Sequence, residues 1–155
     1  EALLPLRVLA AGGAVTTAVA LVVTAVMAAL SALHVVWAFG GVTGNSAVIP
    51  SRDGVPIMRP GRSSTIGVAA GLAVAAYVAL AAAAIAPWPI PGVPVRIGCL
   101  VLALMFAARA IGEFRYVGFF KRVRDTEFAW WDTRVFSPLC IAIAAGYALL
   151  WSAGR

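Results

Sequence analysis

Two charged residues near the end of an apolar run have the spacing of a paired site. Arg109 and Glu113 are four residues apart, which places both side chains on one face of a helix. An unpaired arginine at that depth is costly, so Arg109 should meet Glu113, another carboxylate such as Asp132, or a lipid phosphate. A structural ion pair is the simplest interpretation. The alternative is an anion-binding role for Arg109 and Arg115, because the guanidinium group suits phosphates and carboxylates.

The chain has one histidine, His34, which lies one helical turn before Trp37. With no second histidine and no cysteine at ligand spacing, His34 is a poor metal ligand, and we expect neither a metal nor another cofactor. Ionisable residues inside membranes are rare and tend to be functional. His34 and Glu113 are therefore the candidate acid/base residues. The alternative for His34 is an interfacial side chain that bonds a loop carbonyl.

Residues 112–134, GEFRYVGFFKRVRDTEFAWWDTR, carry about half of the charged side chains. Basic residues following an apolar and aromatic stretch are typical of a segment that lies in the headgroup layer. The first long loop, residues 40–63, is rich in glycine and proline, and we expect it to fold over the same face. The candidate ligand-binding residues are Arg109, Arg115, Trp37, Tyr116, Lys121, Asp132 and Arg134.

The composition indicates a membrane protein. Hydrophobic residues make up 63% of the 155 residues, charged residues 12%, and the mean hydropathy is +0.97. A soluble fold of this size could not hide such long apolar runs; the alternative is a subunit buried in a large soluble complex. The net charge of +6 comes from basic residues that flank apolar runs, so we expect anionic lipid headgroups as partners and no nucleic acid.

The apolar runs predict an all-α membrane protein with four transmembrane helices in a compact bundle and two long loops on one face. Prolines between Pro87 and Pro91 end the second helix, and Pro94 is suited to begin the third. All five tryptophans fall at predicted membrane boundaries, as an aromatic belt requires. The expected helices of this single domain, residues 1–155, are about 13–38, 65–86, 95–112 and 136–152.

The basic residues also predict an orientation. Nine of the 12 lie on the side of the two long loops, which favours cytoplasmic loops with both termini outside. The bias toward alanine, valine, glycine and arginine is typical of a GC-rich bacterial genome, so we expect a bacterial cytoplasmic membrane. Cys99 and Cys140 should lie at different depths, too far apart for a disulfide.

Two helix faces carry small or hydroxyl side chains. In the second helix, Gly67, Gly71, Ala75, Ala79 and Ala83 recur every four residues. Such spacing lets another backbone approach closely, and we favour an intramolecular seam over a dimer interface. In the first helix, the hydroxyl residues Thr17, Thr24 and Ser31 recur every seven residues. They should face the bundle interior, where such hydroxyls often bond backbone carbonyls of their own helix.

Several motifs resemble a family of small bacterial four-helix membrane proteins that is catalogued only as a domain of unknown function. The matching blocks are His34–Gly41, Val55–Gly61, Arg109–Arg122, Asp132–Arg134 and Ser137–Cys140. The longest, RAIGEFRYVGFFKR, is the most distinctive. A slightly different aromatic pattern around Phe39 is the one departure. The resemblance implies a fold and supplies neither an activity nor catalytic residues.

Two functions fit these features. The first is a lipid-binding or accessory protein whose charged-aromatic face holds a lipid headgroup or docks a larger membrane protein complex. The second is a membrane-embedded enzyme acting on a lipid or isoprenoid-like substrate, with Glu113 or His34 as acid/base. Ion-coupled transport lacks support because the second and fourth helices contain no internal ionisable residue. We favour the first function.

Overall fold

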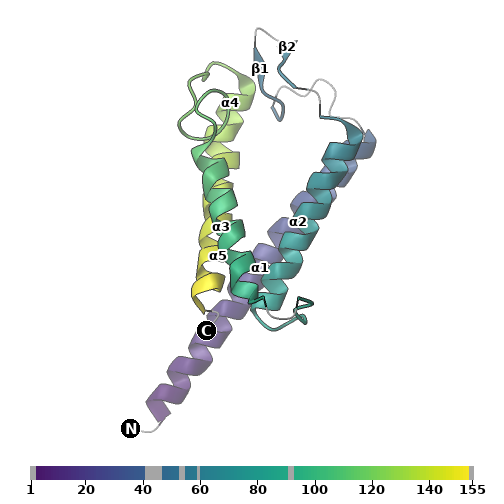
Figure 1. Cartoon of the computed structure of the whole chain (residues 1–155). Helices are drawn as coiled ribbons and strands as arrows, with labels where there is room; N and C mark the ends of the chain where they lie inside the picture. Colours follow the sequence, from purple (N-terminus) through teal and green to yellow (C-terminus); the bar gives the residue numbers. More distant parts are fainter. Residues whose placement is uncertain (1–2, 41–46, 53–54, 59, 91–92, 154–155) are drawn as a thin grey trace.

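Helices make up most of the structure, a computed structural model that describes residues 3–40, 47–52, 55–58, 60–90 and 93–153 (Figure 1). Side chains are described from residue 13 onward within these ranges, except that of Arg52. Gly41 and Arg59, which belong to the resembling blocks, lie outside the described residues. The elements in chain order are α1 (Leu3–Gly40), β1 (Ser51–Arg52), β2 (Val55–Pro56), α2 (Arg62–Ala82), α3 (Val95–Ile111), α4 (Glu127–Trp131), the π-helix η1 (Asp132–Phe136) and α5 (Ser137–Ala153).

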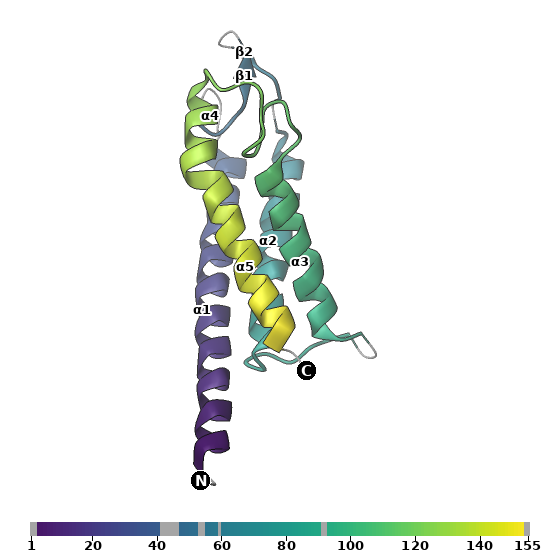
Figure 2. The ribbon, with the colours of Figure 1, turned by 90° about the vertical axis from the view of Figure 1, so that its left-hand side faces the viewer.

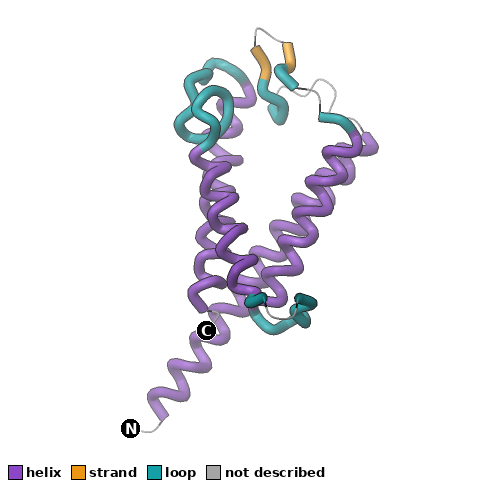
Figure 3. The backbone as a smooth tube through the Cα atoms, in the orientation of Figure 1, coloured by secondary structure: helices purple, strands orange, loops and turns teal. Residues whose placement is uncertain are grey.

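Three helical segments are long and apolar enough to cross a membrane: Gly13–Gly40, Arg62–Ala82 and Glu127–Ala153. The 17 residues of α3 reach the lower end of the usual range, about 17–25 residues. The predicted all-α membrane class is therefore confirmed. The two long loops lie at one end of the molecule, where β1 and β2 form a short antiparallel pair (Figure 3).

Helices α1 and α2 form the first hairpin, and interhelical hydrogen bonds hold it together. Thr24 donates to the carbonyl of Ala76 at 3.2 Å, and Ser31 donates to the carbonyl of Ala69 at 2.8 Å. Thr17, the third hydroxyl on this face, instead donates to the carbonyl of Gly13 in its own helix. Two of the three predicted hydroxyls thus donate hydrogen bonds to the neighbouring helix. Such bonds hold helices together where the surroundings are apolar.

Helices α3 and α5 form the second hairpin, whose core includes the Phe106 ring stacked on Tyr147 at 6.3 Å between centroids. The Tyr147 hydroxyl donates to the carbonyl of Ala75 in α2 at 2.7 Å and so links the two hairpins. Figure 1 shows the hairpins meeting near the short loop and diverging toward the long loops, and Figure 2 shows the second hairpin in front of the first.

The last helical path begins earlier than predicted. We expected the fourth helix to begin near residue 136, but the chain is already helical from Glu127. The Thr126 side chain accepts a hydrogen bond from the Ala129 amide and caps this helix. Phe128 and Ala129 are buried, so packing stabilises this first turn ahead of the predicted start at residue 136.

One helix extends beyond the expected span, and another ends before its predicted limit. Helix α1 begins at Leu3, with Pro5 in its first turn, where proline is tolerated, and it contains the candidate span Gly13–Gly40. Helix α2 ends at Ala82 rather than near residue 86, since Ala84 has a positive φ of 56° and interrupts the helix before the prolines. The two cysteines are free, as predicted.

Candidate functional site

The loop after α3 returns to the end of that helix through two glycines. Gly112 and Gly118 have φ values of +85° and +86°, a region that favours glycine. A Cβ on Gly112 would lie 1.8 Å from the carbonyl oxygen of Val117, and one on Gly118 would lie 2.3 Å from that of Ile111. The glycines therefore allow the two chain segments to touch, and this contact fixes the loop against the helix.

Glu113 closes the turn between these glycines. One carboxylate oxygen accepts from the Arg115 amide at 3.2 Å, and the other accepts from the amides of Tyr116 and Val117. Both oxygens are thus bound by backbone N–H groups. Glu113 does not form the ion pair with Arg109 that its spacing permits, because the chain leaves the helix at Gly112 and turns the carboxylate into the loop.

The carboxylate of Asp132 is the centre of the site. It is fully buried at the start of η1, where one oxygen accepts from Arg109 Nη2 at 3.0 Å. The other oxygen accepts from Lys121 Nζ at 2.9 Å and from the Gly118 amide at 2.7 Å. Of the partners considered for Arg109, the structure therefore shows Asp132. We name Arg109, Lys121 and Asp132 the buried ion cluster.

Lys121 is fully satisfied inside this cluster. Its side chain is 1% exposed. Besides Asp132, the ammonium group donates to the carbonyl of Gly118 at 2.9 Å and to the Thr133 hydroxyl at 2.7 Å. The three acceptors use all three ammonium protons. Lys121 therefore ties the loop to η1 and has no donor left for a ligand.

Arg109 is the accessible member of the cluster. Its side chain is 36% exposed. Its Nη1 atom is buried and has no hydrogen-bond partner among the described residues. Two cations share the single carboxylate of Asp132, so the cluster carries one uncompensated positive charge. An anion next to the partly exposed Arg109 would balance this excess charge.

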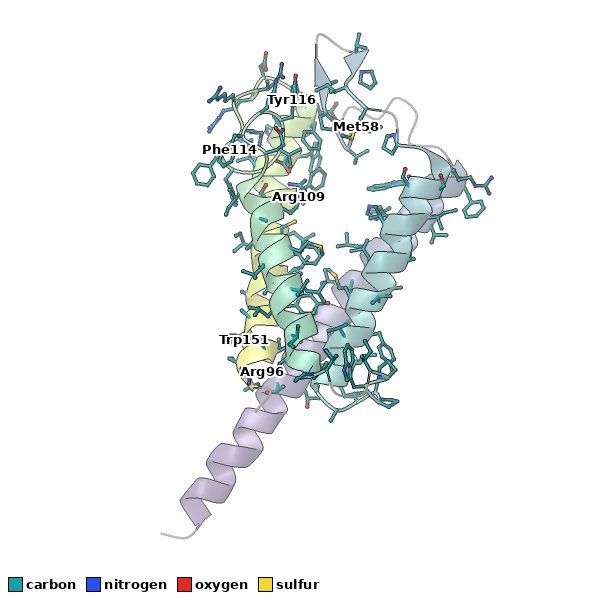
Figure 4. The ribbon with its side chains drawn as sticks, in the orientation of Figure 1. Met58, Arg96, Arg109, Phe114, Tyr116 and Trp151 are labelled. Atoms are coloured by element: carbon teal, nitrogen blue, oxygen red, sulfur yellow. The ribbon has the colours of Figure 1, made fainter. Side chains whose placement is uncertain are left out.

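Arginines stack on aromatic rings around the cluster. The guanidinium carbon of Arg134 lies 4.6 Å from the centroid of the Trp130 ring, and that of Arg115 lies 5.1 Å from the Tyr116 ring. Stacking of this kind holds a cation at a surface while leaving its N–H groups free to bind anions. Figure 4 shows Arg109 and Tyr116 at the same end of α3.

The comparison with protein families gives one match. The family described as "Protein of unknown function (DUF3995)" matches residues 27–147. The chain belongs to this family. No curated protein and no solved structure matches the chain. The match confirms the resemblance to a domain of unknown function.

The matched region of this DUF3995 chain includes the loop after α3 and the buried ion cluster, and it leaves out Trp151. Gly118 and Thr133 complete the cluster although we did not predict them as site residues. The sequence offers one signal for Gly118, its place three residues before the basic run Lys121–Arg124. Thr133 lies in the resembling block Asp132–Arg134, but its residue type alone does not predict a place in the cluster.

His34 and Trp37 lie in the first hairpin of the DUF3995 chain. The Nδ1 atom of His34 is 2.7 Å from the carbonyl oxygen of Leu30, and the imidazole ring is 4.9 Å from the Trp37 ring between centroids. Both of these contacts of His34 are therefore with its own helix. The part of the chain that the structure describes contains no group of three His, Cys, Asp or Glu residues able to hold a metal.

Proposed function

We propose that this protein binds the anionic headgroup of a membrane lipid at Arg109. The observation that carries the proposal is the uncompensated positive charge of the buried ion cluster. Arg109 is the one member of this cluster with a partly exposed side chain. A phosphate or carboxylate beside Arg109 would neutralise that charge. Charge-assisted hydrogen bonds of this kind are roughly twice as strong as neutral ones.

The surroundings of Arg109 support a lipid as the source of the anion. The exposed aromatic side chains of the loop and of α4 are of the kind that lies at the membrane interface: Phe114, Phe119, Phe120, Trp130 and Trp131. The stacked residues Arg115 and Arg134 add positive charge next to them. A headgroup at this depth could contact Arg109 while its lipid stays in the bilayer.

The enzyme hypothesis receives less support from the geometry. A general acid or base needs an ionisable oxygen or nitrogen within reach of the substrate. Both oxygens of Glu113 accept backbone N–H groups, and Nδ1 of His34 is bonded to Leu30. Lipid binding in an accessory role, either alone or beside a larger membrane protein complex, is our proposed function.

We further propose one domain in a bacterial cytoplasmic membrane, with the long loops in the cytoplasm. The excess of basic residues on the long-loop side supports this orientation. Labelling of an introduced cysteine at Asp125, in the long loop, and at Ser152, near the end of α5, would test it in intact cells. Labelling at Asp125 without permeabilisation would contradict the proposed orientation.

Headgroup binding can be tested by native mass spectrometry of the detergent-solubilised protein. Dioleoyl phosphatidylglycerol and dioleoyl phosphatidylcholine share their chains and differ in net charge, so their ratio on the protein measures headgroup preference. We expect the wild type to retain the anionic lipid and Arg109→Gln to reduce the preference about tenfold, the loss expected for one charged hydrogen bond.

Arg96→Gln is the matched control. Arg96 lies near the opposite end of α3, where it stacks on Trp151 at 5.6 Å (Figure 4), so its replacement removes the same charge from the other membrane face. Its lipid preference should equal that of the wild type. An unchanged preference in Arg109→Gln would contradict the proposal. Displacement of the anionic lipid by inorganic phosphate at similar concentration would indicate a soluble anion site instead.

A further inference from the structure

The two hairpins touch at one level of the membrane span. A Cβ on Gly146 of α5 would lie 2.6 Å from Val23 of α1, and one on Gly98 of α3 would lie 3.3 Å from Val78 of α2. Helix α5 thus meets α1, and α3 meets α2. Val23 and Val78 lie at similar depths. Thr24, the residue after Val23, donates a hydrogen bond to Ala76 of α2, which lies two residues from Val78.

From this level toward the long loops, the same faces of α2 and α3 no longer touch. Gly71 and Met105 each lie seven residues from a contact residue, Val78 and Gly98 respectively, and so share its helix face about 10 Å farther along. A Cβ on Gly71 would meet nothing within 4 Å, and Met105 is 52% exposed. The diverging hairpins in Figures 1 and 3 show the same separation.

The open faces end in polar groups. Arg109 lies eleven residues from Gly98 and His34 eleven residues from Val23, which places each about 16 Å beyond its contact residue on the same helix face. Figure 4 shows Arg109 on the side of α3 that faces the first hairpin. The inter-hairpin faces, defined here by Gly71, Met105, Arg109 and His34, are therefore apolar at mid-depth and cationic at the loop end.

This order of properties matches an anionic amphiphile. We propose that the lipid places an acyl chain between the hairpins, against Gly71 and Met105, with its headgroup at Arg109. This position rests on the headgroup site proposed above. The absence of a side chain on Gly71 leaves room for the chain, and flexible Met105 can adapt to it. The net positive charge of the buried ion cluster favours an anionic lipid over the apolar helix of a second copy, because such a helix would bury this net charge without adding an anion.

Filling the inter-hairpin faces tests the chain position separately from the headgroup site. Gly71→Leu should reduce the amount of dioleoyl phosphatidylglycerol retained in native mass spectrometry by about tenfold, because the new side chain takes the space of the acyl chain. Ala73→Leu is the matched control, since exposed Ala73 lies at the same depth on the outer face of α2. It should retain lipid like the wild type.

A second pair of variants approaches the chain from α3. Met105→Trp should reduce retention in the same way, whereas Leu104→Trp, on the lipid-facing side where Leu104 is 61% exposed, should not. The thermal unfolding of each variant shows whether it is folded. The two pairs keep the test decisive if one variant fails to fold.

The outcomes separate the two proposals. Lower retention in Gly71→Leu and Met105→Trp, together with an unchanged ratio of anionic to zwitterionic lipid among the molecules still bound, supports the chain position. Wild-type retention in both folded variants overturns it, even if Arg109→Gln loses the headgroup preference. A wild-type dimer that Gly71→Leu converts to a monomer would also overturn it, because a second copy would then occupy these faces.

Discussion

Lys121 Nζ donates to Asp132 Oδ2 at 2.9 Å, and neither side chain reaches solvent. This pair joins the loop after α3 to the start of the last helical path. Removing one partner from a buried ion pair leaves a charge without compensation, which costs about 3–5 kcal/mol. The structural consequences of the pair can therefore be measured independently of any ligand.

Asp132→Asn should be the most destabilising substitution in the cluster. It leaves Lys121 and Arg109 without a carboxylate, whereas Lys121→Met still leaves Asp132 bonded to Arg109 and to the Gly118 amide. We expect a loss of about 3–5 kcal/mol for Asp132→Asn and a smaller loss for Lys121→Met. Unfolding by denaturant in detergent micelles measures both.

The double variant Asp132→Asn/Lys121→Met should lose less stability than the sum of the single variants, because it removes the orphaned charge as well as the pair. Asp125→Asn provides a control, since Asp125 is exposed in the same loop. Strictly additive losses would show that Lys121 and Asp132 do not act as a pair.

Gly118→Ala should destabilise the loop. The φ of +86° is strained for alanine, and the new Cβ would lie 2.3 Å from the carbonyl oxygen of Ile111. Strain of this kind costs about 1–3 kcal/mol before the clash is added. The thermal unfolding midpoint should fall, while Gly40→Ala, with nothing within 4 Å of its Cβ, should leave it nearly unchanged. Equal midpoints for the two variants would argue against the tight loop.

Glu113→Ala should loosen the turn that its carboxylate closes. The variant loses the acceptors for the amides of Arg115, Tyr116 and Val117, an effect similar to the loss of a helix cap, about 0.5–2 kcal/mol. Hydrogen exchange of these amides should accelerate. Glu113→Gln keeps one carbonyl acceptor and should show a smaller change. The capping role would be refuted if exchange stayed at the wild-type rate in Glu113→Ala.

The helices could be predicted because hydropathy and proline placement act locally. Long apolar runs define the spans, and the interruption near Pro87 separates α2 from α3. Helix α4 was missed because its helicity depends on the Thr126 cap and on burial of Phe128, which a charged and aromatic sequence does not display. Hydropathy and proline placement thus predict the apolar spans, but they do not predict that the last helical path begins at Glu127.

The members of the site were predicted better than their pairing. Arg109, Lys121 and Asp132 were all candidates, yet the i,i+4 spacing favoured Glu113 as a partner for Arg109. That rule holds only within a continuous helix, and Gly112 ends α3 before Glu113. Asp132 replaces it through a chain reversal at Gly118, a tertiary contact that residue spacing does not encode.

The small-residue ridge of α2 was predicted as an intramolecular seam, and its residues divide into two groups. Ala75 and Ala79 are buried at 1% and 0% exposure. Gly67 and Gly71, nearer the long loops, are exposed. The spacing of small residues permits another helix to approach closely. The position at which the helices cross determines which of these small residues are packed against a neighbour.

Gly146→Ala tests the contact on which the hairpin crossing depends. The new Cβ would lie 2.6 Å from Cγ2 of Val23, so α5 or α1 must shift, and overpacking of this kind costs about 1–3 kcal/mol. Val23→Ala in the same chain removes the clashing methyl group and should restore much of the lost stability. Gly67→Ala, which places its Cβ in open space, should be neutral or slightly stabilising because alanine favours helix. Thermal unfolding in one detergent compares the variants. If Gly146→Ala were as stable as the wild type, or if Val23→Ala failed to rescue it, α1 and α5 would not cross at this contact.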